Sequence, residues 1–324
     1  MRADKINVLR WLNGKGHFQG IFWTICASFF SILGDASIRL QGNNLPAMQI
    51  TFFRLFLGTI ILLPILLYKG KSSFAVKNKL GHFFRIIIGF GAIACWVYGA
   101  SQTSLPSITT VSFACPLLVL PLAYIFLSEK SDWRRILSVG AGFLGVLVIA
   151  FFEKNTLAQA SNLLFLHPGI VFLFCGALLF AMSDVINKKM LASENLFSLL
   201  FYFYLGTAVI SFIPALLVWK PMGYQEVLYL LMSGVGGVSI LYCILKAANA
   251  TEISSIAPYK YVELIFSVII GYLLFNEVIE ISTIVGASLI IPSALLIAYY
   301  EINKERKLQA VGNDDFGTLV DVEQ

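Results

Sequence analysis

The sequence predicts an all-α polytopic membrane protein with ten transmembrane helices, arranged as two inverted five-helix repeats. Three observations support this prediction: an apolar composition, a series of long apolar segments, and an internal repeat. Of the 324 residues, 58% are hydrophobic and only 13% are charged. Soluble domains have roughly 45–50% apolar and about 25% charged residues. Since one helical span needs roughly 20 apolar residues, ten spans leave little chain for a separate soluble domain.

Ten apolar segments are each long enough to cross a bilayer as a helix. Their apolar residues do not alternate as they would in the strands of a membrane barrel. Backbone polar groups must be paired inside lipid, and this requirement also favours helices. The predicted spans are residues 18–40, 46–68, 84–103, 107–128, 133–152, 168–189, 196–219, 225–248, 254–275 and 280–300.

Basic residues are distributed unevenly between the predicted loops. Most of the 23 Lys and Arg residues lie in segments on the side of the two termini, whereas the opposite side holds Lys154 and Lys220. The positive-inside rule therefore places both termini in the cytoplasm. We expect a cytoplasmic N-terminal segment, two repeats, and a cytoplasmic, disordered tail. These parts cover residues 1–17, 18–152, 168–300 and 301–324.

Other features argue against further classes of protein. The net charge of +5 resides in the flanking segments, so we expect no nucleic-acid partner. The first apolar run, 20–40, is too long for the apolar part of a signal peptide and lacks a cleavage site. The five cysteines lie in apolar segments without metal-ligand spacing, so we expect no disulfide, metal or cofactor. The three histidines lie in loops or at span edges, and no Gly-x-Ser-x-Gly or His-Glu-x-x-His string occurs, which argues against an enzyme.

An internal repeat appears when the chain is shifted along itself by about 148–150 residues. Asp35 then falls on Asp184, and Arg39 falls on Lys188, so an acid followed one turn later by a base occurs twice. Five spans per half is an odd number, so the second half enters the membrane from the opposite side. Inverted repeats of this kind are a transporter architecture, with the substrate near the midplane. Further matches are Cys26 with Cys175, Gly58 with Gly206, Pro64 with Pro214, Cys95 with Cys243, Ala100 with Ala248, and Glu129 with Glu277.

Ionisable residues inside spans are the first candidates for a substrate site, because each costs about 2.5–3.5 kcal/mol to insert. Asp35 lies one turn from Arg39, and Asp184 lies one turn from Lys188. Each pair is expected to neutralise itself in part. For the basic members, snorkelling at a helix end is the alternative interpretation. The two aspartates, which lie deeper, are predicted substrate-binding residues. Lys246 also lies within a span and joins the candidates.

The ninth predicted span has the densest group of polar side chains, in the string Ala-Pro-Tyr-Lys-Tyr-Val-Glu-Leu over residues 257–264. On a regular helix, Tyr259, Lys260 and Glu263 share one face. Lys260 as a counter-ion of Glu263 is one interpretation, although a buried pair gains little stability over apolar residues. We predict that Glu263 contacts the substrate or a proton. Arg54 in the second span either anchors an anionic group or pairs between helices.

Aromatic residues complete the set of candidates. Trp96 and Tyr98 lie within the third span, and Tyr202 and Tyr204 lie within the seventh. These rings can stack on a planar or cationic ligand, with core packing as the alternative. Glu129 and Glu277 end the fourth and ninth spans, and their symmetry suggests a shared structural role in closing those helices.

These features resemble the drug/metabolite transporter superfamily, EamA type, which has ten spans, two halves, and a glutamate ending the fourth span of each half. Within that superfamily the sequence resembles most the S-adenosylmethionine uptake transporters of obligate intracellular bacteria. The resemblance covers essentially the whole membrane domain. The matching strings are Ser-Asp184-Val-Ile-Asn-Lys188-Lys, Ile-Leu-Lys246-Ala, and Ala-Pro258-Tyr-Lys260-Tyr-Val-Glu263-Leu.

The resemblance implies a secondary transporter that imports S-adenosylmethionine across the cell inner membrane, with exchange against S-adenosylhomocysteine as one mode. An intramembrane acid, basic groups and aromatic faces suit the cations, carboxylate and adenine of that compound. The same set suits an amino acid or a nucleobase derivative, so a carrier of those remains the alternative. An intramembrane enzyme and a lipid scramblase are more distant alternatives. Expected partners are the small-molecule substrate and membrane lipid, with a homodimer as one option for assembly.

Overall fold

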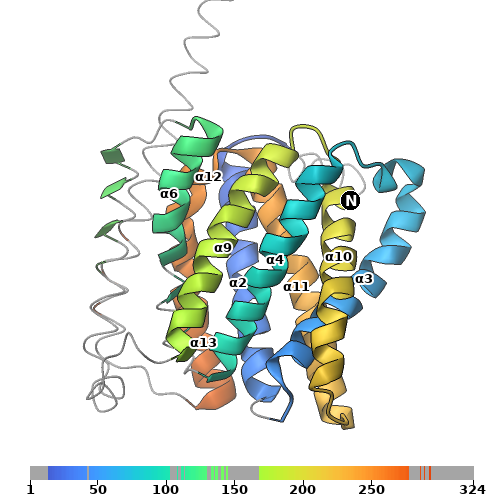
Figure 1. Ribbon diagram of the computed structural model, residues 1–324. Coiled ribbons are helices and arrows are strands. Elements are labelled where there is room, and N and C mark those ends of the chain that lie inside the picture. Colours follow the sequence, from blue (N-terminus) through green and yellow to red (C-terminus); the bar gives the residue numbers. More distant parts are fainter. Residues whose placement is uncertain are drawn as a thin grey trace, which may run out of the picture.

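The computed structural model describes residues 14–41, 44–102, 114–129 and 168–276, with isolated positions between 108 and 144 and between 285 and 292. This part of the chain is a bundle of helices without strands (Figure 1). The fifth and tenth predicted spans lie outside the described residues except for those isolated positions. The helices are α2 (His17–Gln41), α3 (Ala47–Lys69), η1 (Lys71–Phe74), α4 (Lys79–Gln102), α6 (Ala114–Leu127), α9 (Pro168–Met190), α10 (Leu196–Leu217), α11 (Tyr224–Ala250), α12 (Ile253–Ile256), η3 (Ala257–Val262) and α13 (Glu263–Phe275).

Within the described residues, six helices are long and apolar enough to cross a membrane: α2, α3, α4, α9, α10 and α11. Each also has apolar side chains on the outside of the bundle, such as Leu67, Ile213 and Leu217. A helix that is apolar on both its inner and outer faces suits a lipid surrounding. The chain is therefore a multi-pass membrane protein.

The second half of the chain runs opposite to the first. The carboxylate of Glu194, between α9 and α10, accepts hydrogen bonds from the backbone of Lys77 and Asn78, which precede α4. At this same end, the Gly16 amide before α2 bonds the Ala250 carbonyl at the end of α11. We call this the proximal end, and the opposite end, where α3, α9 and α11 begin, the distal end (Figure 1). Since α2 starts and α9 stops at the proximal end, the two equivalent helices are antiparallel.

Packing between the two halves follows the repeat. The most extensive contacts join α2 to α11 and α4 to α9, and these pairs are equivalent when the halves are exchanged. Contacts of α13 with α2 and of α6 with α9 are equivalent in the same way. The bundle is thus interleaved, and its centre lies between helices of different halves.

The ends of α6 and α13 match in backbone conformation. Ser128 follows α6 with φ 55°, and Asn276 follows α13 with φ 52°. A left-handed residue directly after a helix is a common termination, and these two residues stand 148 positions apart. Glu129 comes next after Ser128, and its carboxylate accepts the Ile253 amide at 3.2 Å. Glu129 therefore follows the end of α6 and also caps the start of α12.

The ninth predicted span is broken, although the sequence predicted one continuous helix over 254–275. The structure divides it into α12, η3 and α13. Pro258 stands in the first turn of η3, and proline lacks the amide that a continuous helix would use. The break places Lys260 and Glu263 where η3 meets α13. From there α13 runs about 18 Å to the distal end at 1.5 Å per residue, so the break lies deep in the bundle.

Candidate functional site

The centre of the site is a pair of buried acids from opposite halves. Asp35 on α2 is 4% exposed, and Glu263 at the start of α13 is 9% exposed. The two carboxyl groups interact electrostatically, and Glu263 is also hydrogen-bonded to the side chain of Ser31. The Trp96 indole donates to Asp35 Oδ1 at 3.0 Å and packs edge-on against Phe180. Two buried acids at one place are costly unless a cation or a proton joins them.

Lys260 neutralises a third acid instead of Glu263. Its Nζ lies 2.8 Å from Asp184 Oδ2, which joins η3 to α9. Lys260 still interacts electrostatically with Glu263, one helical turn away. Lys260 is therefore the counter-ion mainly of Asp184, and only secondarily of Glu263.

Arg54 reaches the acid pair from α3. Its guanidinium interacts electrostatically with Asp35 and lies near Gly34 of α2 and Gly237 of α11. A Cβ at Gly237 would stand 3.0 Å from Arg54 Nε and 2.9 Å from the Tyr204 hydroxyl. Glycine at this position therefore lets the guanidinium lie deep between helices. Within the described residues, the guanidinium makes no hydrogen bond, so its donors are available to an anion.

The predicted pairing along each helix is replaced by contacts between helices. Asp35 binds Trp96, while the Arg39 guanidinium lies 4.2 Å from the centre of the Phe275 ring. The Lys188 ammonium donates to the carbonyls of Ala248 and Thr251 at the end of α11. A cation at the C-terminal carbonyls of a helix is favourable. Asp35 and Asp184 therefore lie at the centre of the bundle and are not paired with Arg39 and Lys188.

Three predicted residues lie away from this centre. The Tyr259 hydroxyl lies 3.2 Å from Nε2 of His17 at the proximal end, because η3 does not keep the α-helical face that the sequence predicted. The Lys246 ammonium lies 6.0 Å from the Trp23 ring and 5.8 Å from the Tyr242 ring.

Tyr98 lies near the distal end of α4, with its ring 4.7 Å from that of Phe172. It lines a cavity of about 310 Å³. This cavity is lined by Leu45, Pro46, Ala47, Tyr98, Ser101, Gln102 and Lys220. Neither Asp35 nor Glu263 lines this cavity, so it is separate from the acid pair.

Ser31 and Cys115 belong to the centre but were not among the sequence candidates. Ser31 gives no signal beyond its residue type, because its role depends on a contact across the bundle. Cys115 on α6 interacts electrostatically with Lys260, Asp184 and Glu263. Its position could have been found in the sequence, because it stands 148 residues before Glu263.

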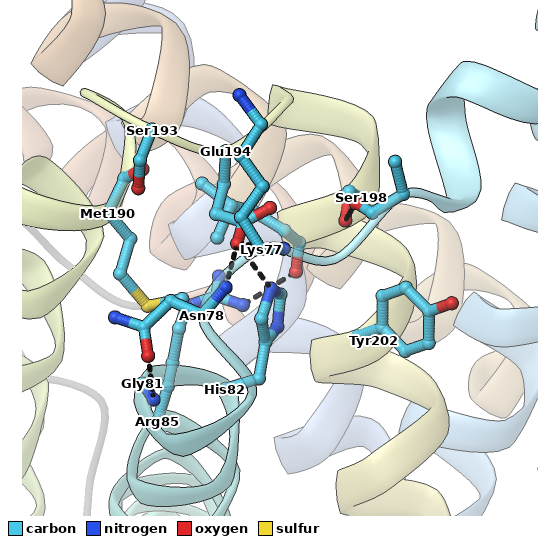
Figure 2. A network of polar contacts seen from close by, with 12 residues as sticks. Lys77, Asn78, Gly81, His82, Arg85, Met190, Ser193, Glu194, Ser198 and Tyr202 are labelled. Carbon is cyan, nitrogen blue, oxygen red and sulfur yellow. Dashed lines mark hydrogen bonds and ion pairs between the residues drawn. The ribbon is translucent and has the colours of Figure 1, made fainter.

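A second polar network lies at the proximal end (Figure 2). Glu194 accepts the amides of Lys77 and Asn78 at 2.7 and 2.6 Å and lies 3.9 Å from His82 Nε2. Arg85, also buried, donates to the Asn187 side chain and to the Leu199 carbonyl. The network ties the loop before α4 to α9 and α10.

The fold and the central charges together define a class of protein. Inverted halves, a broken helix and ionisable groups near mid-depth are the features of secondary transporters. The chain belongs to the EamA-like transporter family, whose model matches it twice, over residues 18–151 and 167–299.

The similarity to known proteins covers most of the chain. The S-adenosylmethionine uptake transporter of Rickettsia prowazekii (strain Madrid E) is 34% identical over 287 residues, covering 89% of this chain and 95% of that protein. Solute carrier family 35 member G1 of Mus musculus is 27% identical, covering 85% of this chain and 76% of that protein. A solved crystal structure matches with a TM-score of 0.70 at 17% identity, covering 88% of this chain and 97% of that chain. That structural match concerns the fold.

Proposed function

We propose that the protein is a secondary transporter that imports S-adenosylmethionine across the cell inner membrane, with both termini in the cytoplasm. Exchange against S-adenosylhomocysteine is the proposed mode. The observation that supports this function best is the group of opposite charges deep between the halves, in a chain 34% identical to the named Rickettsia transporter.

The central residues complement S-adenosylmethionine group by group. Its ammonium and sulfonium are cations, and the Asp35–Glu263 pair offers two acids for them. Its carboxylate requires a donor group, and the Arg54 guanidinium is the better placed of the two predicted bases, because Lys260 is held by Asp184. Charge-assisted hydrogen bonds of this kind are typically worth about 1.5–3 kcal/mol each. Trp96 holds Asp35 in place through its indole N–H.

Flux into proteoliposomes tests the proposal. Vesicles that contain the purified protein and internal S-adenosylhomocysteine should accumulate labelled S-adenosylmethionine, and external S-adenosylhomocysteine should compete. The Arg54→Met variant should weaken uptake of S-adenosylmethionine much more than uptake of its decarboxylated analogue. The exposed Lys220→Met variant serves as a matched control at the distal end. If folded protein moves neither compound, the proposed substrate is wrong.

A carrier of amino acids is the second candidate function. Arg54 and the acid pair would complement the carboxylate and ammonium of any α-amino acid, with no adenosyl group required. Labelled methionine, supplied to the same vesicles, distinguishes the two functions. Methionine flux without S-adenosylmethionine flux would favour the second.

A further inference from the structure

Cys115 stands in the first half where Glu263 stands in the second. The shift of 148 residues aligns the end of α6 at Leu127 with the end of α13 at Phe275. The same shift aligns the left-handed residues Ser128 and Asn276. The exposed Tyr124 and Tyr272, and the buried Ala123 and Gly271, also coincide. The matching backbone conformation and burial of the surrounding residues therefore show that Cys115 and Glu263 occupy equivalent positions, although their side chains differ in chemistry.

Contacts place Cys115 at the same centre as its counterpart. The thiol Sγ lies 3.7 Å from the Ala177 carbonyl on α9, and α6 packs against both α9 and η3. Its electrostatic partners are Lys260, Asp184 and Glu263. All of these residues belong to the second half, so α6 reaches across the boundary between the halves, and Cys115 is only half-buried there.

The two equivalent positions differ in charge and size. Glu263 brings a long acidic side chain, whereas Cys115 brings a short, uncharged and polarizable one. A site related by two-fold symmetry would hold the same group on both walls. Here the position in the second half carries an acid, whereas the position in the first half is neutral and has the smaller side chain.

We propose that Cys115 lines the proposed solute site between the halves, on the first-half side where Glu263 stands on the second-half side, and contacts the uncharged part of the solute, selecting for its size. The proposal rests on the proposed transport function. It assigns the cationic end of S-adenosylmethionine to Glu263 and Asp35, and the flat adenosyl group to the Cys115 wall. Cys115 is therefore a specificity-determining residue.

Cross-linking tests the geometry without any solute. In a variant with Glu263→Cys and with Cys26, Cys95, Cys175 and Cys243 replaced by Ser, a short bifunctional thiol reagent should link positions 115 and 263. Mass spectrometry of the digested protein reads out the link. The matched control retains Cys175, which is exposed on α9, in place of Cys115 and should form no link to position 263. Absence of the link at position 115 in folded protein would overturn the proposal.

Protection from alkylation tests the contact with solute. In a variant whose only cysteine is Cys115, S-adenosylmethionine at about ten times its Kd should slow alkylation roughly tenfold, by occupancy of the site. The variant whose only cysteine is Cys175 should show no protection. If S-adenosylmethionine is transported but leaves Cys115 alkylation unchanged, the proposal fails while the proposed function stands. If S-adenosylmethionine is not transported, the proposed function fails, and protection by methionine or adenosine, whichever the vesicles accumulate, decides the proposal.

A larger side chain at position 115 distinguishes direct contact with the solute from simple proximity to it. Cys115→Leu should weaken the binding of S-adenosylmethionine more strongly than the binding of methionine, whereas Cys175→Leu, at an exposed position on α9, should change neither. Unchanged affinity for S-adenosylmethionine in folded Cys115→Leu protein would contradict a role in selecting for size.

Discussion

At the scale of single residues, the charges at the centre of the protein differ in how they are paired. Lys260 and Asp184 form a direct ion pair between η3 and α9. Lys188 binds the terminal carbonyls of α11. Asp35 and Glu263, by contrast, meet as two acids. A buried pair of acids is an unfavourable arrangement unless a cation or a proton joins it, and under the proposed function the cationic part of the solute is that partner.

Glu263→Gln should lower the affinity for S-adenosylmethionine about ten- to hundredfold, because it removes one charge-assisted interaction and retains the shape. The loss should be larger for S-adenosylmethionine than for S-adenosylhomocysteine, which lacks the sulfonium. Competition binding to the purified protein measures both affinities. Glu226→Gln, at the start of α11 near the distal end, should change neither. Unchanged affinity in the Glu263 variant would exclude it from the site.

The Lys260–Asp184 pair should behave as a structural pair. Lys260→Met or Asp184→Leu alone leaves one buried charge without its partner and should destabilise the protein by about 3–5 kcal/mol. The double variant should regain most of that stability, as measured by thermal unfolding in detergent, and should regain transport. A stable double variant without transport would show instead that the pair takes part in solute movement.

At the scale of the elements, the sequence predicted the helices well and their interruption poorly. Apolar length and boundary residues predicted spans that the described helices α2, α3, α4, α9, α10 and α11 match within a few residues. The break at Pro258 was not predicted, because proline is tolerated in membrane helices when neighbours satisfy the freed backbone groups. Here Glu129, which lies 124 residues before Ile253, caps the start of α12 ahead of the break. Contacts of this range leave no local pattern in the sequence.

The same limit applies to the candidate site. The cost of ionisable groups in lipid singled out the residues that the structure brings together at the centre, Asp35, Arg54, Asp184, Lys260 and Glu263. Spacing along one helix paired Asp35 with Arg39 and Asp184 with Lys188, whereas the structure gives both aspartates partners on other helices. Tyr98, Tyr259 and Lys246 were chosen for their type and position in a span, and the structure places them elsewhere.

The network around Glu194 should keep the proximal end closed (Figure 2). Glu194→Ala removes the acceptor of the Lys77 and Asn78 amides, so the loop before α4 should open more often. Each charge-assisted hydrogen bond is worth about 1.5–3 kcal/mol, so alkylation of a cysteine placed at the buried Ser73 should accelerate by about tenfold or more. Glu226→Ala provides the matched control, since its carboxylate belongs to the distal end. An unchanged alkylation rate would exclude Glu194 from closing this end.

At the scale of the whole molecule, the approximate two-fold symmetry gives the transporter two equivalent ends. Exchanging the halves converts the contact of α2 with α11 into that of α9 with α4. It also relates two side-chain-to-backbone contacts at opposite ends of the bundle, which we call clasps. Gln49 at the start of α3 exchanges two hydrogen bonds with the backbone of Lys220, each 2.9 Å long. Ser198, its counterpart at a shift of 149, bonds the Ala75 carbonyl at 2.9 Å. Movement of solute would require these clasps to open in turn.

The orientation of this symmetric bundle depends on its basic residues alone, and it can be tested directly. Because the proximal loops contain most of the Lys and Arg residues between spans, the proximal end should face the cytoplasm. In a chain without its native cysteines, Ala75→Cys and Tyr224→Cys place one exposed thiol at the proximal and one at the distal end. A membrane-impermeant thiol reagent added to intact cells should label position 224, and position 75 should react only after the membrane is permeabilised. Labelling of both positions from outside would contradict the inverted topology, and the reverse pattern would invert the proposed orientation.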